Sequence, residues 1–326
     1  MGLKSPHLQG RDRVNTSVFV GIDVAKRHLD VHILPKNAAS RYTNSRAGIG
    51  ALTKMLQKHR PELVVLEATG RLEIPAAVAL CAAGIPVAIV NPRHVRDFAR
   101  ASGQLAKTDA LDARVIATYG SALHPDARPM PDSLTLKLQG LLARRRQLVD
   151  MVVAEKNRLD RAHPAARKDV REHIEWLGKR LKRADRELNE LIKHSPQWRE
   201  RDARYQSVPG VGPVVSHTLL IDLPELGSIS HKSIAKLVGV APLNRDSGAA
   251  RGTRSVWGGR THVRSALYMA SLAALRANPV IREHYQKLRA LGKPPKVAQV
   301  ACMRKLLVIL NAIAEKNTAW SPQELT

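Results

Sequence analysis

The sequence predicts an α/β domain followed by two mainly helical regions, and three patterns indicate this fold class. Short apolar runs alternate with helical spacing over 17–125, which is typical of a sheet layered with helices. Apolar residues then recur at helical spacing over 133–196, where charges fill the other positions, so we expect a helical hairpin or an antiparallel coiled coil. The third region, 197–326, is predicted to be a mainly α-helical domain.

The α/β domain is expected to contain five strands and several helices. Apolar spacing predicts strands at 18–24, 29–34, 40–43, 63–67 and 86–90, and helices at 48–59 and 74–83. Residues 91–107 are basic with little apolar pattern, so we expect a mobile loop there. A helix should begin at Asp109, because Thr108 is a suitable cap and an acid suits the positive end of a helix. Residues 1–16 predict a flexible basic arm, and the prolines within 125–131 predict a linker.

Composition indicates a polyanionic partner. The 53 lysines and arginines exceed the 28 acidic residues and give a formal charge of +25, which favours nucleic acid. Aromatic residues make up only 3%, which argues against base stacking as the main mode of contact. Two cysteines are too few for a disulfide framework or a zinc cluster. We expect no membrane-spanning segment and no signal peptide, and hence a cytoplasmic, prokaryotic protein that is associated with the nucleoid when it acts.

Four acidic residues form the first candidate site. Asp23 and Glu67 lie at the ends of predicted strands, and Asp109 and Asp112 are three residues apart on a predicted helix. Acids at the ends of buried strands are costly unless they are paired or bind metal, and residues three apart on a helix share one face. Hard oxygen ligands suit Mg²⁺, and two such ions can stabilise the attacking and leaving oxygens of a phosphodiester displacement. The alternative is that each acid is simply exposed at the end of its element.

A glycine-rich loop over 242–260 forms the second candidate site. Ser247 lies in this loop among four arginines, which could bind a phosphate and stabilise a serine alkoxide. Composition alone makes this a weak prediction, because the loop serines could simply be solvated. Further nucleic-acid contacts are expected from residues of the hairpin, of a Pro-Gly-x-Gly turn that resembles a helix-hairpin-helix element, and of the loop itself: Arg144, Arg145, Arg146, Gly210, Gly212, Arg251, Arg254 and Arg260. A solvated helix face or a plain turn explains each of these residues by itself.

Five sequence blocks, taken together and in this order, resemble the DEDD transposases of the insertion-sequence 110 family and the related Piv-type DNA invertases. The blocks are Gly21-Ile22-Asp23-Val24-Ala25-Lys26, Leu66-Glu67-Ala68-Thr69-Gly70, Lys107-Thr108-Asp109-Ala110-Leu111-Asp112-Ala113, Pro209-Gly210-Val211-Gly212, and Asp246-Ser247-Gly248 with Trp257-Gly258-Gly259-Arg260 and Leu267-Tyr268-Met269. Trp257-Gly258-Gly259-Arg260 departs from the Lys-x-Gly pattern of some members, which leaves the contacts around Arg260 open.

The resemblance implies a specific domain organisation and mechanism. It implies a ribonuclease-H-like (RuvC-like) catalytic domain at 17–125, a coiled-coil insertion at 133–196 and a C-terminal transposase domain at 197–326. Asp23, Glu67, Asp109 and Asp112 would bind Mg²⁺, and Ser247 would form a covalent phosphoserine link to DNA. The two sites would meet between subunits of a dimer or tetramer, and a structured bridge RNA would pair with target and donor DNA.

Three other functions are open at this point. One is a metal-dependent junction resolvase or nuclease that uses water. Another is a site-specific invertase without guide RNA. The third is an inactive protein that binds RNA or bridges DNA, whose acids only cap strands and helices.

Overall fold

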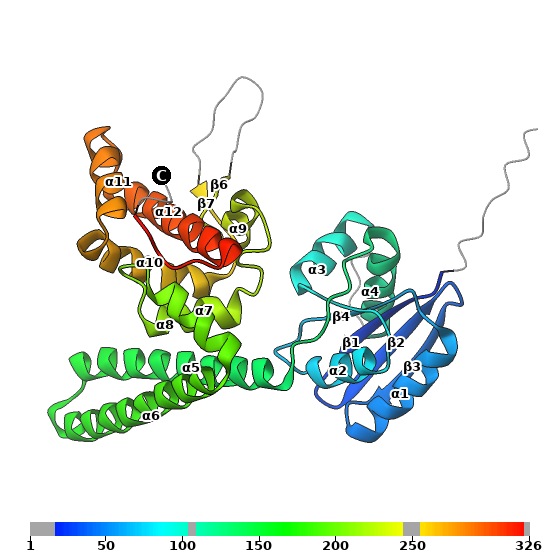
Figure 1. Ribbon diagram of the computed structural model, residues 1–326. Helices are drawn as coiled ribbons and strands as arrows, with labels where there is room; N and C mark the ends of the chain where they lie inside the picture. The colour runs from blue at the N-terminus through cyan, green and yellow to red at the C-terminus, as the bar shows by residue number, and fades with distance from the viewer. Residues whose placement is uncertain (1–16, 104–108, 244–254, 323–326) are drawn as a thin grey trace, which may run out of the picture. The chain divides into compact units, whose positions relative to one another are not determined.

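The computed structural model describes residues 17–103, 109–243 and 255–322, and the chain divides into two compact units, Met1–Pro131 and Asp132–Thr326. The predicted basic arm at 1–16 therefore lies outside the described residues. Figure 1 shows an N-terminal unit built on a sheet and a C-terminal unit built mainly of helices. The predicted succession of an α/β part and helical parts is confirmed at this level.

The first unit is organised around a five-stranded mixed sheet. Its strands are β1 (Phe19–Val24), β2 (His28–Leu34), β3 (Ala38–Thr43), β4 (Leu63–Glu67) and β5 (Val87–Val90), in the spatial order β3-β2-β1-β4-β5. β1, β2 and β3 are antiparallel neighbours, whereas β4 runs parallel to both β1 and β5. All five strands lie where the apolar runs predict them, and this sheet is compatible with a ribonuclease-H-like domain.

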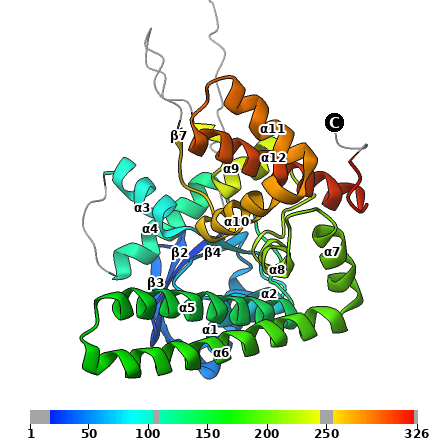
Figure 2. The ribbon, with the colours of Figure 1, turned by 90° about the vertical axis from the view of Figure 1, so that its left-hand side faces the viewer.

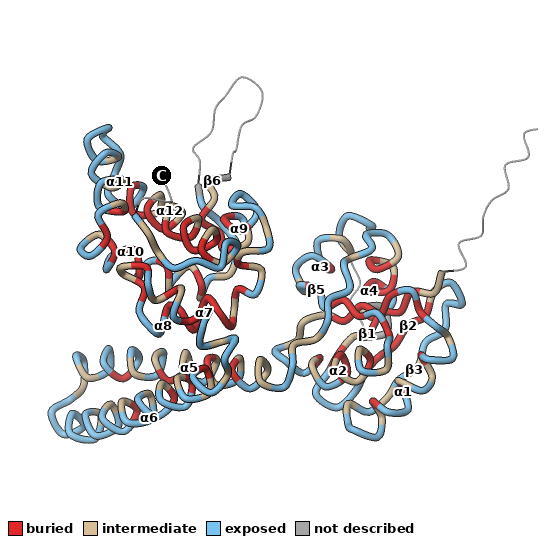
Figure 3. Tube along the Cα trace, in the orientation of Figure 1, coloured by how far each residue is buried: buried red, intermediate tan, exposed pale blue. Residues whose placement is uncertain are grey.

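Helices cover both faces of this sheet. On one face, α1 (Arg46–His59) and α2 (Ile74–Ala82) bury side chains such as Leu52 and Leu80 against the even-numbered residues of β1. On the other face, α3 (Pro92–Ala101) and α4 (Asp109–Leu123) pack against its odd-numbered residues. Figure 3 shows the buried strands between these exposed helix surfaces. The alternation along β1 thus determines which side chains face α4.

The prediction of a loop over 91–107 is wrong for its first part, because residues Pro92–Ala101 form α3. The side chain of Asn91 caps this helix by accepting a hydrogen bond from Arg93 N at 2.9 Å, and Pro92 stands at its first position. Val95 and Phe98, three residues apart, pack into the core beneath the helix. The apolar and charged residues follow helical spacing, but the many charges give the segment the composition of a polar loop.

Gly21 allows α4 to lie very close to β1. A Cβ atom at Gly21 would stand 2.2 Å from Ala113 O and 2.3 Å from Ala117 N, both backbone atoms of α4. Backbone atoms cannot move away as a flexible side chain can, so any larger residue would push the helix off the sheet.

We expect Gly21→Ala to lower the free energy of unfolding by about 3 kcal/mol or more, because overpacking against backbone lies at the high end of such effects. The matched control is Gly50→Ala in α1, where a Cβ atom meets nothing within 4 Å and alanine is the better helix former. This control should gain about 0.5–1 kcal/mol. Urea unfolding of both variants checks the pair, and equal effects would contradict the close approach of α4.

The second unit begins with a long helical hairpin, as the leucine spacing predicts. Its helices are α5 (Ser133–Arg161) and α6 (Arg167–His194), joined by the short 3-10 helix η1 (Pro164–Ala166). Leu148 and Leu177 are buried between the two helices. Figure 2 shows α5 and α6 side by side over most of their length.

The rest of the second unit packs around its last helix. Its elements are α7 (Pro196–Gln206), α8 (Pro213–Asp222), α9 (His231–Val238), β6 (Pro242–Leu243), β7 (Ser255–Val256), α10 (Thr261–Ala277), α11 (Pro279–Ala290) and α12 (Pro295–Lys316). Within the described residues, α12 is the one helix long and apolar enough to span a membrane, and 56% of its apolar window is buried. Leu306 and Leu310 lie in the main core of this unit, so its apolar character has a structural cause.

Candidate catalytic site and nucleic-acid interface

Asp23 and Glu67 come together because their strands are parallel neighbours. The register pairs Phe19 with Leu63 and continues to Ile22 and Leu66, so one further step places Asp23 beside Glu67 at the carboxyl ends of β1 and β4. Phe19 packs in the core beneath α4, and Asp23 has the same parity, so it points to the same face. Both acids are partly exposed, as expected at the edge of a core.

The direction of α4 points its N-terminus toward the end of the sheet that carries these two acids. His124, the residue after α4, packs edge-on against Phe19 at the start of β1, whereas Ala113 and Ala117 pass over Gly21, nearer the carboxyl end of β1. Continuing along the helix in this direction leads to its first turn, which carries Asp109 and Asp112. Asp112 is partly exposed, and the side chain of Asp109 lies outside the described residues.

A fifth acid, Asp30, was missed by the sequence analysis. It pairs directly with Asp23 across β1 and β2 and is nearly buried. Arg41 binds it at both oxygens, with Nε to Oδ1 at 2.6 Å and Nη2 to Oδ2 at 3.1 Å. This ion pair compensates the charge of Asp30, which therefore does not add to the charge that a metal ion would have to balance. The sequence feature that could have revealed Asp30 is an acidic residue at an inward-facing position of a predicted strand.

Glu73 is the second acid that the sequence analysis missed, and it holds the turn after Glu67. Its side chain is buried and accepts a hydrogen bond from Thr69 N at 3.0 Å through Oε2. Thr69 also donates from Oγ1 to the carbonyl of Glu67 at 3.1 Å. These bonds fix the backbone that follows the carboxylate and so restrict its position.

The donor set of the four predicted acids suits a hard divalent cation, because all of its ligand atoms are carboxylate oxygens. No three histidine, cysteine or acidic side chains of the described residues form a group that could hold a metal ion. Asp23, Glu67 and Asp112 all have interactions within the protein. The structure thus does not bring Asp23, Glu67 and Asp112 together as one metal-binding group, and the side chain of Asp109 lies outside the described residues.

The second predicted site lies on a loop whose base is well anchored. Ser247, with Arg245, Arg251 and Arg254, falls in the segment 244–254, outside the described residues. The flanking strands β6 and β7 pair with each other, Pro242 with Val256 and Leu243 with Ser255. A Cβ atom at Gly259 would stand 2.4 Å from Gly239 N, so two backbones cross at this base. The chain thus enters and leaves the Ser247 loop at a fixed place in the second unit.

Arg260 fastens the base of this loop to the end of α8. Its Nη1 and Nη2 each bind one oxygen of Glu225 at 2.6 Å, and Nη1 also donates to Asp222 O at 2.8 Å. A bidentate pair of this kind is geometrically specific. The guanidinium predicted to contact nucleic acid is therefore already engaged within the protein.

Asp222 is the centre of a charge cluster beside this ion pair. Its side chain is 12% exposed and accepts from Arg146 and from His262, whose Nε2 lies 3.1 Å from Oδ2. Burial alone would raise the pKa of Asp222, but the His262 hydrogen bond and the Arg146 charge outweigh it, and its pKa falls below the ordinary value of 3.8. The ionised form of Asp222 therefore stabilises the folded unit.

We expect Asp222→Asn to lower the free energy of unfolding by about 1–3 kcal/mol at neutral pH, because it weakens bonds to a buried carboxylate. The loss should shrink as the pH falls below about 4. The pKa of Asp222 is lower in the folded state than in the unfolded state, so ionised Asp222 stabilises the fold above the unfolded-state pKa, and this stabilisation disappears as the pH falls through the folded-state pKa. Urea unfolding between pH 3 and 7 measures this, with exposed Asp150→Asn as the control. A loss independent of pH would contradict the account.

The remaining predicted contact residues differ in their surroundings. Arg145 binds Asp185, with Nε to Oδ1 at 2.5 Å, and Arg146 binds Asp222. Arg144 is exposed and donates a hydrogen bond to Gln147 at 3.2 Å. Gly210, in the turn between α7 and α8, has φ +100° and lies against the Ala274 backbone, so packing requires a glycine there. Gly212 precedes α8 and has open space around it.

The family is decided by two matches that together span most of the chain. The family model of the IS110 DEDD transposases matches residues 20–162, and the model described as "Transposase IS116/IS110/IS902 family" matches residues 202–286. This chain belongs to the IS110 transposase family. It is accordingly a DNA transposase or recombinase, and membership of a DEDD family implies dependence on a divalent metal.

Similar proteins extend over nearly the whole chain. The pilin gene-inverting proteins of Moraxella bovis and Moraxella lacunata are each 27% identical over 312 residues, covering 93% of this chain and 97% of theirs. An insertion element IS110 uncharacterized 43.6 kDa protein of Streptomyces coelicolor is 23% identical over 390 residues, covering 94% of this chain and 96% of its own. Proteins similar to this chain are thus named for DNA inversion and for an insertion element.

Proposed function

We propose that this IS110-family enzyme cuts and rejoins DNA through a Mg²⁺-dependent DEDD site and a covalent phosphoserine intermediate. The proposal is supported by the register of β1 and β4, from which Asp23 and Glu67 are expected at neighbouring strand ends, and by the course of α4, whose first turn carries Asp109 and Asp112. The finer assignment of the first unit as a ribonuclease-H-like, RuvC-like catalytic domain rests on the same arrangement of acids. The second and third predicted parts remain a coiled-coil insertion at 133–196 and a transposase domain at 197–326.

The four acids would hold two Mg²⁺ ions and would orient the scissile phosphate against them. Bound Mg²⁺ would supply charge stabilisation to the attacking and leaving oxygens. Glu73 and Thr69 fix the backbone behind Glu67, and the first turn of α4 presents the remaining pair of acids. The protein's own role is therefore to bind the phosphate in one orientation.

Ser247 is proposed as the nucleophile. Its Oγ attacks the phosphorus, a new P–O bond to serine forms, and the bond to the leaving strand breaks as the departing oxygen takes up a proton. A hydroxyl of the incoming strand then attacks the phosphoserine and returns a proton to Ser247. Breaking and making one phosphodiester in each step conserves bond energy, so no external energy source is needed. The arginines at 251 and 254 would bind the phosphate charge.

The acids and Ser247 lie on different units of the chain, so we propose that a dimer or tetramer assembles one composite centre from two subunits. A structured bridge RNA would pair with target and donor DNA and select the sites. The positive charge of +25 suits both nucleic acids.

An invertase without guide RNA is the second candidate, because two of the similar proteins are named as pilin gene-inverting proteins. A water-using junction resolvase is a third, and the covalent step separates it from the other two. All three share the DEDD acids, so loss of those acids does not distinguish them.

Sequencing the RNA that copurifies with the protein, expressed with its native flanking DNA, tests the guide. We expect one enriched, structured transcript from the flank, with loops that match target and donor DNA. A diffuse mixture of cellular RNA would contradict guidance and favour direct DNA reading, as in an invertase.

A further inference from the structure

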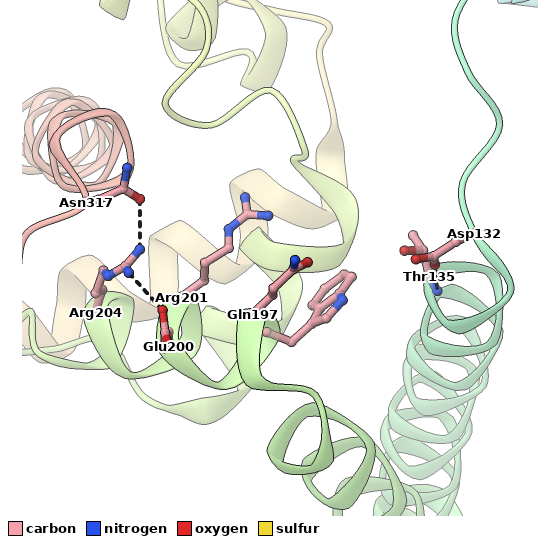
Figure 4. Close-up of a pocket in the computed structure, with 8 residues that line it drawn as sticks. Asp132, Thr135, Gln197, Glu200, Arg201, Arg204 and Asn317 are labelled. Atoms are coloured by element: carbon pink, nitrogen blue, oxygen red, sulfur yellow. Dashed lines mark hydrogen bonds and ion pairs between the residues drawn. The ribbon is translucent and has the colours of Figure 1, made fainter.

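A polar pocket of about 440 Å³ lies within the second unit, away from the base of the Ser247 loop. Its lining comes from α7, the start of α5 and the residue that ends α12: Asp132, Thr135, Gln197, Trp198, Glu200, Arg201, Arg204 and Asn317. The volume is within the range of small-ligand sites, about 300–1,000 Å³. Figure 4 shows Gln197 and Arg201 extending from α7, with Asp132 and Thr135 across the space at the start of α5.

Of the two arginines that line this pocket, Arg201 is positioned to bind an external anion and Arg204 is not. Arg204 is held by the protein, because Nη1 donates to Asn317 Oδ1 at 2.8 Å and Nη2 lies 3.3 Å from Glu200 Oε2. Arg201, one turn earlier, is partly buried and has no hydrogen-bond or ion-pair partner among the described residues. A partly desolvated guanidinium without a partner is suited to an anion, and phosphate is the anion that its planar donors bind best.

An aromatic ring and amide groups accompany this cation. Trp198 is partly buried and packs against the core of the second unit, so its ring is held in place while its remaining surface lines the pocket. Gln197 contributes an amide that can both donate and accept. A fixed aromatic face beside an arginine and an amide is the combination that binds an unstacked base and its phosphate.

Asp132 sets the orientation of such a ligand. Its carboxylate accepts a hydrogen bond from Thr135 N at 2.7 Å and caps α5. A phosphate beside this acid would be repelled, so the phosphate belongs at the Arg201 end and the base at the side of Trp198.

We propose that this pocket binds a single unpaired nucleotide, with its base on Trp198 and its phosphate on Arg201. An unpaired nucleotide can come from DNA whose strands are being exchanged or from a bulge or loop of RNA. The chemistry is the same for both, so the experiment distinguishes the source. The inference does not depend on the metal site or on Ser247.

The test is equilibrium binding of the full-length protein to short duplexes in EDTA, which prevents cleavage. Each duplex is prepared flush or with one unpaired 2-aminopurine nucleotide, as DNA and as RNA. We expect at least one bulged duplex to bind about fivefold or more tightly than its flush partner. The 2-aminopurine fluorescence should fall on binding as the base stacks on Trp198. Tighter binding of the bulged duplex with a fall in fluorescence, for DNA alone, RNA alone or both, supports the proposed site and identifies the nucleic acid that supplies the nucleotide.

Two variants and a matched control make the test specific. Arg201→Gln should remove the preference for the bulge, and Trp198→Leu should also remove the fluorescence change. Arg199→Gln removes the same charge from an exposed position on α7 that does not line the pocket, and should weaken flush and bulged duplexes equally. Circular dichroism checks that both variants fold. If Trp198→Leu does not fold, the loss of bulge preference in Arg201→Gln alone tests the pocket.

Equal affinity of the wild-type protein for flush and bulged duplexes of both kinds would overturn the proposal. So would a loss of preference in Arg199→Gln equal to that in Arg201→Gln. Because every binding measurement is made without metal, failure here leaves the proposed recombination chemistry intact, and failure of that chemistry leaves this site intact.

Discussion

Replacing Ser247 with alanine is expected to lower recombination by at least about 10⁴-fold, because removal of a covalent nucleophile in other enzymes has effects of this size or larger. The alanine variant should remain folded and should bind DNA nearly as well as the wild type. A two-plasmid recombination reporter, read by quantitative sequencing of the junctions, measures the change.

The matched control for this prediction is Ser255→Ala, which removes a serine hydroxyl from β7 at the base of the same loop. It should retain activity within about threefold, because it leaves the proposed nucleophile in place. Substantial recombination by Ser247→Ala, or equal loss in both variants, would contradict a nucleophilic role for Ser247.

The second large effect is expected from Glu67→Gln at the end of β4. This change keeps the shape of the side chain but removes the charge that a divalent cation requires. Loss of an outer-shell partner of a metal ligand costs about 10–100-fold, so loss of a ligand itself should lower strand cleavage by at least about 100-fold. Cleavage of labelled DNA over a Mg²⁺ titration measures this.

Glu62→Gln provides the control, because Glu62 lies just before the same strand and its side chain is 48% exposed. Its activity should match the wild type at every Mg²⁺ concentration. Thermal unfolding of both variants should show that the sheet is intact. Unchanged cleavage by Glu67→Gln would mean that the DEDD site is not the metal site.

Much of the first unit could be predicted from its sequence, because its strands are short apolar runs with sharp ends. Residues Leu63–Glu67 form β4 as predicted, and the expected strands at 18–24 and 29–34 differ from β1 and β2 by one residue at the start. The helix α3 was missed because charged residues dominate its composition, although Val95, Phe98 and Ala99 contact the core on one side. Local patterns are easily recognised where burial is continuous and easily overlooked where few residues touch the core.

The arrangement of the site could be predicted in part. The four acids were recognisable as a group, but the register of β1 with β4 and the close approach of α4 at Gly21 are tertiary features. Asp30 and Glu73 were missed because their partners, Arg41 and Thr69, are known only once the chain is folded. The same holds for the pocket at Arg201, which combines residues from three helices that are distant in sequence.

The most direct test of the central claim is to map the covalent bond between protein and DNA. Wild-type protein would be incubated with its DNA and Mg²⁺, denatured and digested, and the peptides carrying a nucleotide adduct would be identified by mass spectrometry. The account predicts an adduct on Ser247, absent in EDTA and absent from Glu67→Gln. An adduct on another residue, or cleaved DNA with no adduct, would contradict it.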